Sequence, residues 1–394
     1  MMQRTIAWLI VGLLWLYSSP MACHADGEKT TDTNDQTAAA DPLPADEPES
    51  EKGRIEGKTK NIGVAPIPII FYTPETSFAI GGGVVFTFRD SNHPNDNRPD
   101  SLRLIAAYTM KNQIFFSLTP EIYFNEKIDK ITINTNYSHW PSSFFGIGND
   151  SGIDADTIDD LEEVYTRESF MVRPWILHRT VSHLSIGITM DVKRSNISDI
   201  EDGGLLDQGR LTGANGGIRS GLGPVLSWDT RDAIFYPTRG SWYNIWSWHY
   251  RNAWGSDFDY DVYALDLRHY WTITDDHILA LHALGISTDG EVPFDELPTP
   301  IIRGLYENLF VDEHMFTLEM EYRFPIHERW SGATFAAVGD VFHDPENYEI
   351  QDIKYAGGGG IRYAISEEDK INLRFDIGVS PYGVFPYVLF QEAF

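Results

Sequence analysis

Hydrophobic and polar residues alternate along residues 315–325 (MFTLEMEYRFP). A period of two residues predicts a β-strand with one apolar and one polar side. The polar side carries Glu319, Glu321 and Arg323, and a dry core cannot hold three ionisable groups without water or partners. The stretch therefore predicts one strand of a barrel whose exterior is apolar and whose interior is wet and charged.

The same alternation recurs from Ile67 onward in runs of about ten residues, separated by clusters of Asn, Asp, Gly and Pro. Transmembrane β-barrel strands have this length and this weak period-two pattern. We therefore predict the all-β class and, within it, a transmembrane antiparallel β-barrel of about sixteen strands. The predicted strands are 67–72, 77–88, 102–110, 114–124, 130–139, 163–176, 182–192, 216–228, 240–250, 260–272, 278–288, 315–324, 331–342, 353–365, 370–379 and 384–394.

Aromatic residues make up 13% of the sequence, and several Trp and Tyr residues lie near the ends of predicted strands. Membrane proteins carry their interfacial aromatic girdles at these places. The alternative is the core of a soluble β-sandwich, whose interior would have to be dry. Charged residues predicted to face inward recur on strand after strand and favour the barrel: Glu121, Arg167, Arg173, Asp229, Arg231, Asp266, Arg268, Glu319, Glu321, Arg323, Arg362, Arg374 and Asp376.

Residues 1–25 have the features of a secretory signal peptide. Arg4 supplies a basic start, residues 6–17 form an apolar run too short to span a bilayer comfortably, and small residues lead up to Ala25. An uncleaved anchor and lipidation of Cys23 are the alternatives. Residues 26–60 are acidic and poor in large hydrophobic residues, which predicts a disordered linker, and residues 61–394 form the predicted barrel.

The formal net charge of −28 argues against nucleic acid as a partner, because phosphate binding requires the opposite sign. The single cysteine, Cys23, lies in the predicted signal peptide, so we expect no disulfide. We predict no metal and no cofactor, since the acidic run 154–163 lacks the glycine and the terminal glutamate of an EF-hand loop. The sequence contains no Gly-x-Ser-x-Gly motif, and we predict that the protein is not an enzyme.

Several stretches resemble motifs of the bacterial surface antigen family, which contains the BamA/TamA-like outer-membrane barrels. Residues 221–232 (GLGPVLSWDTRD) and 236–240 (YPTRG) are similar to its barrel hairpin, with Asp229, Arg231, Asp232 and Gly240 at the motif positions. Residues 302–305 (IRGL) resemble its inward-folded-loop motif. The strands that follow are similar as well, at 321–325 (EYRFP), 335–342 (FAAVGDVF), 357–363 (GGGGIRY) and 373–376 (LRFD).

The resemblance implies a loop that folds into the barrel lumen and contains Ile302, Arg303, Gly304 and Leu305. In the family the loop arginine contacts acidic groups on neighbouring strands, so Glu319 and Glu321 are the expected lumen partners, with Arg323 next to them. A buried guanidinium without such partners is very costly. Glycine after the arginine lets the backbone pass close to the barrel wall.

Two departures from the family pattern concern this loop. Leu305 stands where the family has an aromatic residue, and Ala337 stands where it has an acidic one, so we expect rewired contacts around Arg303. In the hairpin motif we expect a structural ion pair between Asp229 and Arg231 inside the lumen.

The resemblance also implies a location and a function. The sequence ends on Phe394, which we expect to be the last residue of the last strand and a signal for outer-membrane targeting. Membership would place the protein in the bacterial outer membrane, in contact with lipid and lipopolysaccharide. There it would assist the assembly or translocation of outer-membrane proteins, with these clients or the assembly machinery as partners. The linker has no room for the soluble POTRA domains of full members, so we predict a short member.

Two other classes of function stay open: a passive pore or structural barrel without insertion activity, and a barrel enzyme. Assembly activity predicts poor pairing between the strand near Ile67 and the strand that ends at Phe394. A pore predicts a continuous polar lumen that the Arg303 loop does not block. An enzyme predicts a converging cluster of Ser, His and acidic residues.

Overall fold

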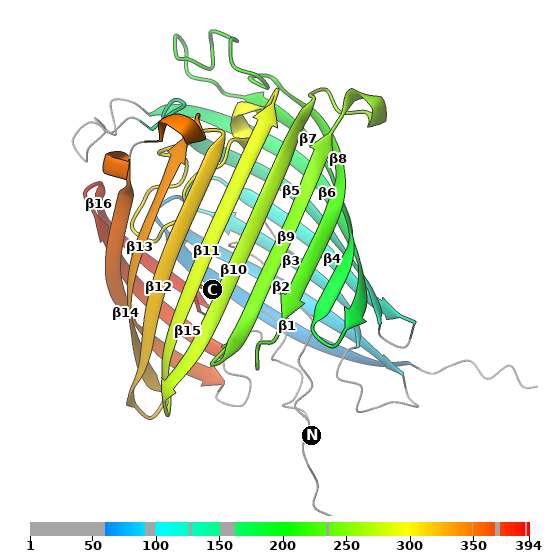
Figure 1. The fold of residues 1–394 in the computed structure, drawn as a ribbon, viewed down its shortest axis with the longest axis vertical. Coiled ribbons are helices and arrows are strands. Elements are labelled where there is room, and N and C mark those ends of the chain that lie inside the picture. Colours follow the sequence, from blue (N-terminus) through cyan, green and yellow to red (C-terminus); the bar gives the residue numbers. More distant parts are fainter. Residues whose placement is uncertain are drawn as a thin grey trace, which may run out of the picture.

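The computed structural model describes residues 60–90, 99–125, 128–149, 162–233, 236–348, 350–366, 371–390 and 392–394. Over these ranges the chain forms sixteen antiparallel strands that close into one barrel, in which successive strands are neighbours (Figure 1). The predicted fold class is confirmed. The predicted signal peptide with Cys23, the predicted linker up to residue 59 and most of the acidic run 154–163 lie outside the described residues.

Within the described ranges the strands are β1 (Lys60–Thr73), β2 (Ser77–Asp90), β3 (Asp100–Thr109), β4 (Ile114–Phe124), β5 (Asp129–Phe144), β6 (Glu163–Val181), β7 (Leu184–Ser198), β8 (Gly216–Asp229), β9 (Gly240–Tyr250), β10 (Tyr260–Thr274), β11 (His277–Gly290), β12 (His314–His327), β13 (Trp330–Phe342), β14 (Lys354–Ser366), β15 (Ile371–Ser380) and β16 (Gly383–Phe390). Short 3₁₀-helices lie in the connections: η1 (Asn252–Trp254), η2 (Phe294–Glu296), η3 (Pro345–Asn347) and η4 (Ile350–Asp352). Among the residues that the structure describes, no helix is long and apolar enough to span a lipid bilayer.

The first and last strands differ most from the prediction. β1 begins at Lys60 instead of Ile67 and runs through Pro66 and Pro68, although proline cannot donate a backbone hydrogen bond to a neighbouring strand. Prolines are tolerated in a strand whose outer edge is not fully paired. β16 ends at Phe390, so the predicted extension of the last strand to residue 394 is wrong.

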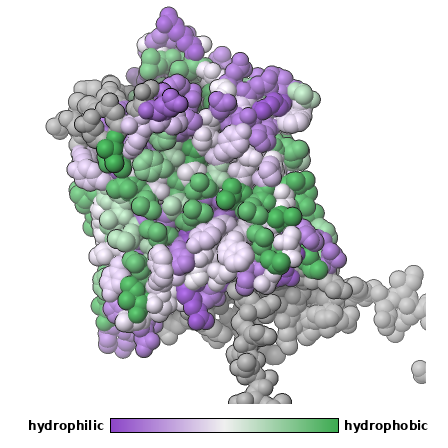
Figure 2. Space-filling model, viewed as in Figure 1, coloured by the Kyte–Doolittle hydropathy of each residue, from purple (hydrophilic) through white to green (hydrophobic). Residues whose placement is uncertain are grey.

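Alternation along the strands separates an apolar exterior from a charged interior. In β12 the side chains of Leu318 and Met320 are exposed, whereas those of Glu319 and Glu321 are buried. Figure 2 shows apolar residues gathered around the middle of the barrel, with hydrophilic residues concentrated toward the upper end. Barrels that face lipid carry such an apolar band. The chain is therefore a transmembrane barrel and not a soluble sandwich.

The two ends of the barrel differ in their connections. At one end, here called the short-turn end, two-residue turns join β6 to β7, β10 to β11 and β12 to β13. At the other end, the long-loop end, lie the connections 199–215, 251–259 and 291–313 (Figure 1, top). Outer-membrane barrels of bacteria show the same contrast between the turns on one side and the loops on the other.

The connection between β11 and β12, residues 291–313, folds into the barrel and is called the lumen loop below. Its residues Phe294, Leu305 and Phe310 are at most 5% exposed. They pack in one apolar cluster with wall residues that include Trp175 and Trp246. The predicted inward-folded loop is confirmed, and it fills the lumen toward the long-loop end.

The seam between β1 and β16 is the least paired part of the sheet. Over the described residues its register consists of one pair, Tyr72 with Val388, whereas β8 and β9 are matched at seven positions. Continued along both strands, this register sets Ile70 opposite Phe390. The part of β1 before Ile70 therefore extends beyond the end of β16 and has no partner in that strand.

Side chains contribute more to the seam than backbone pairing does. On the inner face, Ile69 and Phe71 of β1 pack in one cluster with Phe385 and Leu389 of β16. These apolar contacts hold β1 and β16 together, but most of the edge of β1 that faces β16 has no hydrogen-bonded neighbour in that strand.

Pro66 and Pro68 lie on this unpaired part of β1. Because they are two residues apart, their backbone nitrogens face the same side of the strand. The N–H of Met110 on the β3 side donates to the carbonyl of Phe78, so even-numbered residues of β2 face β3 and odd-numbered ones face β1. In the register of β1 with β2, the even-numbered residues of β1 therefore face away from β2, and the missing donors of both prolines fall on the open side, where proline is tolerated. The sequence of β1 thus matches a strand with one open edge.

Candidate functional site

The lumen loop carries Arg303 to the wall formed by β12 and β15. Its Nε donates a hydrogen bond to Oε1 of Glu319 at 2.7 Å, and its Nη1 donates to Oδ2 of Asp376 at 2.7 Å. Its Nη2 lies 2.6 Å from Oε2 of Glu321. The guanidinium also lies over the ring of Phe335, 3.7 Å from the ring centroid. Three carboxylates and an aromatic face make this buried arginine a strong point of attachment for the loop.

Gly304 lets the loop backbone pass against the barrel wall. Its φ is +106°, a conformation that favours glycine, and a Cβ atom there would lie 3.0 Å from Cβ of Ala356. Its N–H donates to the hydroxyl of Tyr387 on β16 at 2.9 Å. Ile302 and Leu305, which flank Arg303 and Gly304 in the sequence, are both buried in the apolar cluster of the lumen and anchor the motif at its two ends.

The Arg303 contacts belong to a larger charge network. Glu321 lies 2.7 Å from Nε of Arg323 and 3.2 Å from Nη2 of Arg362. Nε of Arg374 lies 3.3 Å from Oδ2 of Asp376. Within the described ranges the network joins four arginines to four carboxylates, so that its charges balance: Arg303, Arg323, Arg362 and Arg374 with Glu319, Glu321, Asp376 and Glu392.

The structure brings most of the sequence-predicted loop and lumen residues together. Glu319 and Glu321 lie next to Arg303, whereas Arg323 contacts Glu321. Asp376 on β15 is the partner that the sequence reasoning did not select. The alternation along its strand predicts that Asp376 faces the lumen. Which of the lumen-facing residues contacts the loop depends on where the loop crosses the lumen, and the strand pattern does not show this. Asp376 supplies a third carboxylate, whereas Ala337 on β13 supplies none.

The hairpin motif forms a structural unit between β8 and β9. Arg231 donates from Nε and Nη2 to the two carboxylate oxygens of Asp229 at 3.0 and 3.1 Å, and both side chains are buried. Asp232 accepts a hydrogen bond from the N–H of Thr238 across the turn at 2.9 Å. Gly240 has a φ of +98°, and a Cβ atom there would collide with a backbone carbonyl. These contacts shape the hairpin itself.

Phe394 lies inside the barrel. It is 7% exposed, packs with Tyr270 and Ala280, and its carbonyl oxygen accepts a hydrogen bond from Nη2 of Arg323 at 3.0 Å. The expectation that Phe394 is the last residue of a strand is wrong, because β16 ends at Phe390.

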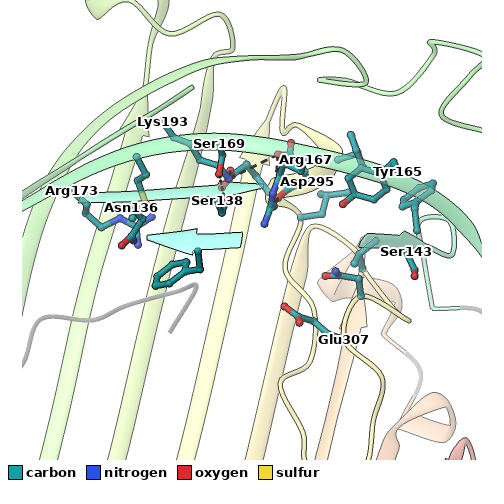
Figure 3. A pocket seen from close by; sticks show the side chains of 18 residues that line it. Asn136, Ser138, Ser143, Tyr165, Arg167, Ser169, Arg173, Lys193, Asp295 and Glu307 are labelled. Atoms are coloured by element: carbon teal, nitrogen blue, oxygen red, sulfur yellow. Dashed lines mark hydrogen bonds and ion pairs between the residues drawn. The ribbon is translucent and has the colours of Figure 1, made fainter. Parts of the chain in front are cut away.

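A second set of ion pairs holds the beginning of the lumen loop, and Figure 3 shows the part of it around Arg167, Lys193 and Asp295. Asp295 lies 3.9 Å from Arg167 on β6, and Lys193 on β7 lies close by and pairs with Glu296. Asp295 also pairs with Arg219 on β8. The charges are reversed relative to the Arg303 contacts: here acidic loop residues meet a basic wall. The lumen loop is thus tied to two separate parts of the wall, β6–β8 and β12–β15.

Sequence reasoning missed this second attachment. Arg167 was among the residues predicted to face inward, and Asp295 and Glu296 stand in a proline-bounded segment of the loop. An adjacent acidic pair in a loop predicted to fold inward is a signal for basic partners in the wall. The strand pattern alone does not say which strands supply them.

Two carboxylates meet where the lumen loop passes the turn between β1 and β2. The N–H of Glu307 donates to Oε1 of Glu75 at 3.4 Å. Burial away from water, and then repulsion by Glu75, raise the pKa of Glu307 to about 7. Burial also raises the pKa of Glu75. Glu307 therefore changes its charge close to neutral pH, beside the seam strand β1.

The described residues thus form a membrane-spanning barrel with an arginine loop tied across its lumen and a barely paired seam between the first and last strands. Among solved structures, the chain is similar to BamA from Haemophilus ducreyi lacking POTRA domains 1-3. The identity is 12% and the TM-score 0.58, over 85% of this chain and 70% of that chain. It is also similar to CdiB from Escherichia coli, with 11% identity and a TM-score of 0.56, over 86% of this chain and 68% of that chain.

At these identities the likeness to BamA and CdiB shows a shared fold. No protein-family model matches the chain, and no curated protein sequence matches it.

Proposed function

We propose that this protein is a bacterial outer-membrane barrel that assists the assembly or translocation of outer-membrane proteins through its β1–β16 seam. The observation that carries the proposal is the edge of β1 before Ile70, which has no partner in β16. Backbone groups without partners are costly in the lipid interior. Such an edge favours an extended strand that pairs with it, and a client polypeptide supplies such a strand.

The lumen loop supports the same proposal. It fills the lumen toward the long-loop end, which disfavours a wide passage for solutes straight through the barrel. Its two ion-paired attachments, Arg303 to β12 and β15 and Asp295 to β8, are made to strands other than β1 and β16. Strands β1 and β16 then separate without loss of the remaining barrel.

The likeness of fold to BamA and CdiB supports the bacterial outer membrane as the location. In this proposal the apolar belt of Figure 2 contacts lipid and lipopolysaccharide, and the seam contacts client outer-membrane proteins or the assembly machinery. Residues 1–25 then act as the export signal that the sequence predicts.

A disulfide across the seam tests the proposal. Cysteines in place of Tyr72 and Val388, in a background with Cys23→Ser, lie directly opposite each other and lock the seam when oxidised. With the protein in lipid vesicles, we expect oxidation to abolish the accelerated insertion of an unfolded small outer-membrane barrel, and reduction to restore it. A matched pair between β2 and β3, Ile80→Cys with Tyr108→Cys, controls for oxidation itself. A locked protein that is as active as the reduced one refutes the role of the seam.

A passive pore or structural barrel is the second candidate. Pro66 and Pro68 have no backbone N–H, so the open edge offers fewer hydrogen bonds to a client strand, and this favours a barrel that binds no client. Single-channel conductance in planar bilayers separates the two candidates. If the lumen loop closes the barrel, wild-type protein gives a small, flickering conductance, and Arg303→Ala gives a large, steady one. A large and stable conductance in both proteins would favour a porin-like channel.

A further inference from the structure

The segment that follows β16, residues 392–394, lies in the lumen at the short-turn end and is called the inner segment below. Oε2 of Glu392 accepts a hydrogen bond from Nε of Arg362 at 3.1 Å and lies 3.6 Å from Nε of Arg323. Oε1 of Glu392 accepts a hydrogen bond from Nδ2 of Asn372 at 2.8 Å. The Glu392 side chain is 2% exposed, so these partners take the place of water.

Phe394 provides a second attachment for the inner segment. It packs against Tyr270 and Ala280, and its ring centroid lies 5.1 Å from that of His282. The hydrogen bond from Arg323 to its carbonyl oxygen joins this packing to the charge network. The inner segment is thus held by ion pairs and by apolar contacts.

A straight continuation of β16 would put the same residues in a different place. In the register of the seam, Glu392 would stand opposite Pro68 on the open edge of β1. Positions of this parity in β1 face outward, where Ile62 is 62% exposed and Val64 is 54% exposed. The extension would therefore put a carboxylate on the lipid-facing surface, where charge is strongly disfavoured. The inward turn gives this carboxylate two arginines instead.

We propose that Glu392 sets the length of the seam. Its ion pairs hold the inner segment in the lumen and keep the edge of β1 open, and without them the segment extends β16 along β1. In the inner position, the edge from Lys60 to Ile69 is free for another strand. In the extended position, residues of the protein itself occupy the part of that edge next to β16. The inner segment is thus a built-in competitor of any strand that binds β1.

Two cysteine pairs distinguish the positions of the inner segment. In the extended position Ala393 lies opposite Ile67 on the inner face, so Ile67→Cys with Ala393→Cys forms a disulfide there. Tyr72→Cys with Val388→Cys reports the part of the seam that is common to both positions and serves as the control. All variants carry Cys23→Ser and are compared in lipid vesicles under mild oxidation.

We expect the 67–393 disulfide to form slowly while Glu392 is present and about tenfold faster with Glu392→Val, because two charge-assisted contacts no longer hold the segment in the lumen. The isosteric Glu392→Gln should give an intermediate rate, and it replaces the valine variant if that protein fails to fold. The 72–388 disulfide should form at the same rate in all these proteins.

Rapid formation of the 67–393 disulfide in the presence of Glu392 would overturn the inference. A rate that neither substitution at Glu392 changes would overturn it as well. The readout is the register of two strands and requires no client. A failure here is therefore distinguishable from a failure of the proposed function, which is tested by locking the seam.

Discussion

Loss of Arg303 should destabilise the barrel mainly through one residue, Glu319. Glu321 and Asp376 also contact Arg303, but both retain Arg362 as a partner. Among the described residues, Arg303 alone forms an ion pair with Glu319, whose side chain is 7% exposed. Arg303→Met keeps an apolar side chain near the ring of Phe335 and removes the positive charge. The buried carboxylate of Glu319 then has no ion-pair partner among the described residues.

The expected size of the effect follows from this single unpaired charge. Removing one member of a buried ion pair costs about 3–5 kcal/mol, because the remaining charge stays buried without a partner. We therefore expect Arg303→Met to lower the free energy of unfolding by about 3–5 kcal/mol. Neutralising Glu319 as well restores the charge balance of the network, so Arg303→Met with Glu319→Gln should lose only about 1–3 kcal/mol.

Urea unfolding in lipid vesicles, followed by tryptophan fluorescence, measures these differences. Arg374→Met is the matched control, because its partner Asp376 keeps both Arg303 and Arg362. We expect the control to lose less stability than Arg303→Met. If the double variant is as unstable as Arg303→Met alone, an unpaired Glu319 is not the source of the loss, and the reasoning is refuted.

Gly304→Ala keeps the charges of the lumen loop but puts a Cβ atom 3.0 Å from the wall at a φ of +106°. We expect an unseated loop and a larger single-channel conductance; an unchanged conductance would contradict this. Glu307 has its pKa raised from 4.5 to about 7, so the folded protein binds this proton more tightly than the unfolded chain does, and stability falls as the pH rises across that interval. Glu307→Gln should remove this part of the pH dependence in thermal melts, and an unaltered profile would exclude Glu307 as its source. Pro66→Val with Pro68→Val adds two backbone donors to the open edge of β1, and we expect more barrel dimers on native gels; a purely monomeric variant would show that these positions do not face the seam.

The strand pattern could be predicted because lipid and lumen impose opposite preferences on alternate residues. The predicted runs 114–124 and 240–250 match β4 and β9 residue for residue. The resemblance to motifs of the bacterial surface antigen family also located the lumen loop, since the Arg-Gly pair and the acidic residues of the next strand stand close together in the sequence.

The end of β16 shows where this information stops. The predicted strand 384–394 alternates well enough, yet the strand ends at Phe390. Glu392 would face lipid in a longer strand, and its partners Arg323 and Arg362 lie on strands that are distant in the sequence. Periodicity predicts the face on which a side chain lies, but it does not predict which residue lies across the lumen. For the same reason the pairing of Asp295 with the basic wall was not predictable.

The seam described above also bears on how the barrel forms. Tyr72 and Val388 lie near opposite ends of the barrel sequence. Bringing their strands together therefore has a larger entropic cost of loop closure than forming a hairpin between successive strands. In return, ring closure gains one registered backbone pair. We therefore expect closure to be the last step of folding and the first contact to open in local unfolding. The barrel is therefore a curved sheet whose edge strands, β1 and β16, are held together mainly by apolar side-chain contacts. Its circumference is not fixed by hydrogen bonding alone.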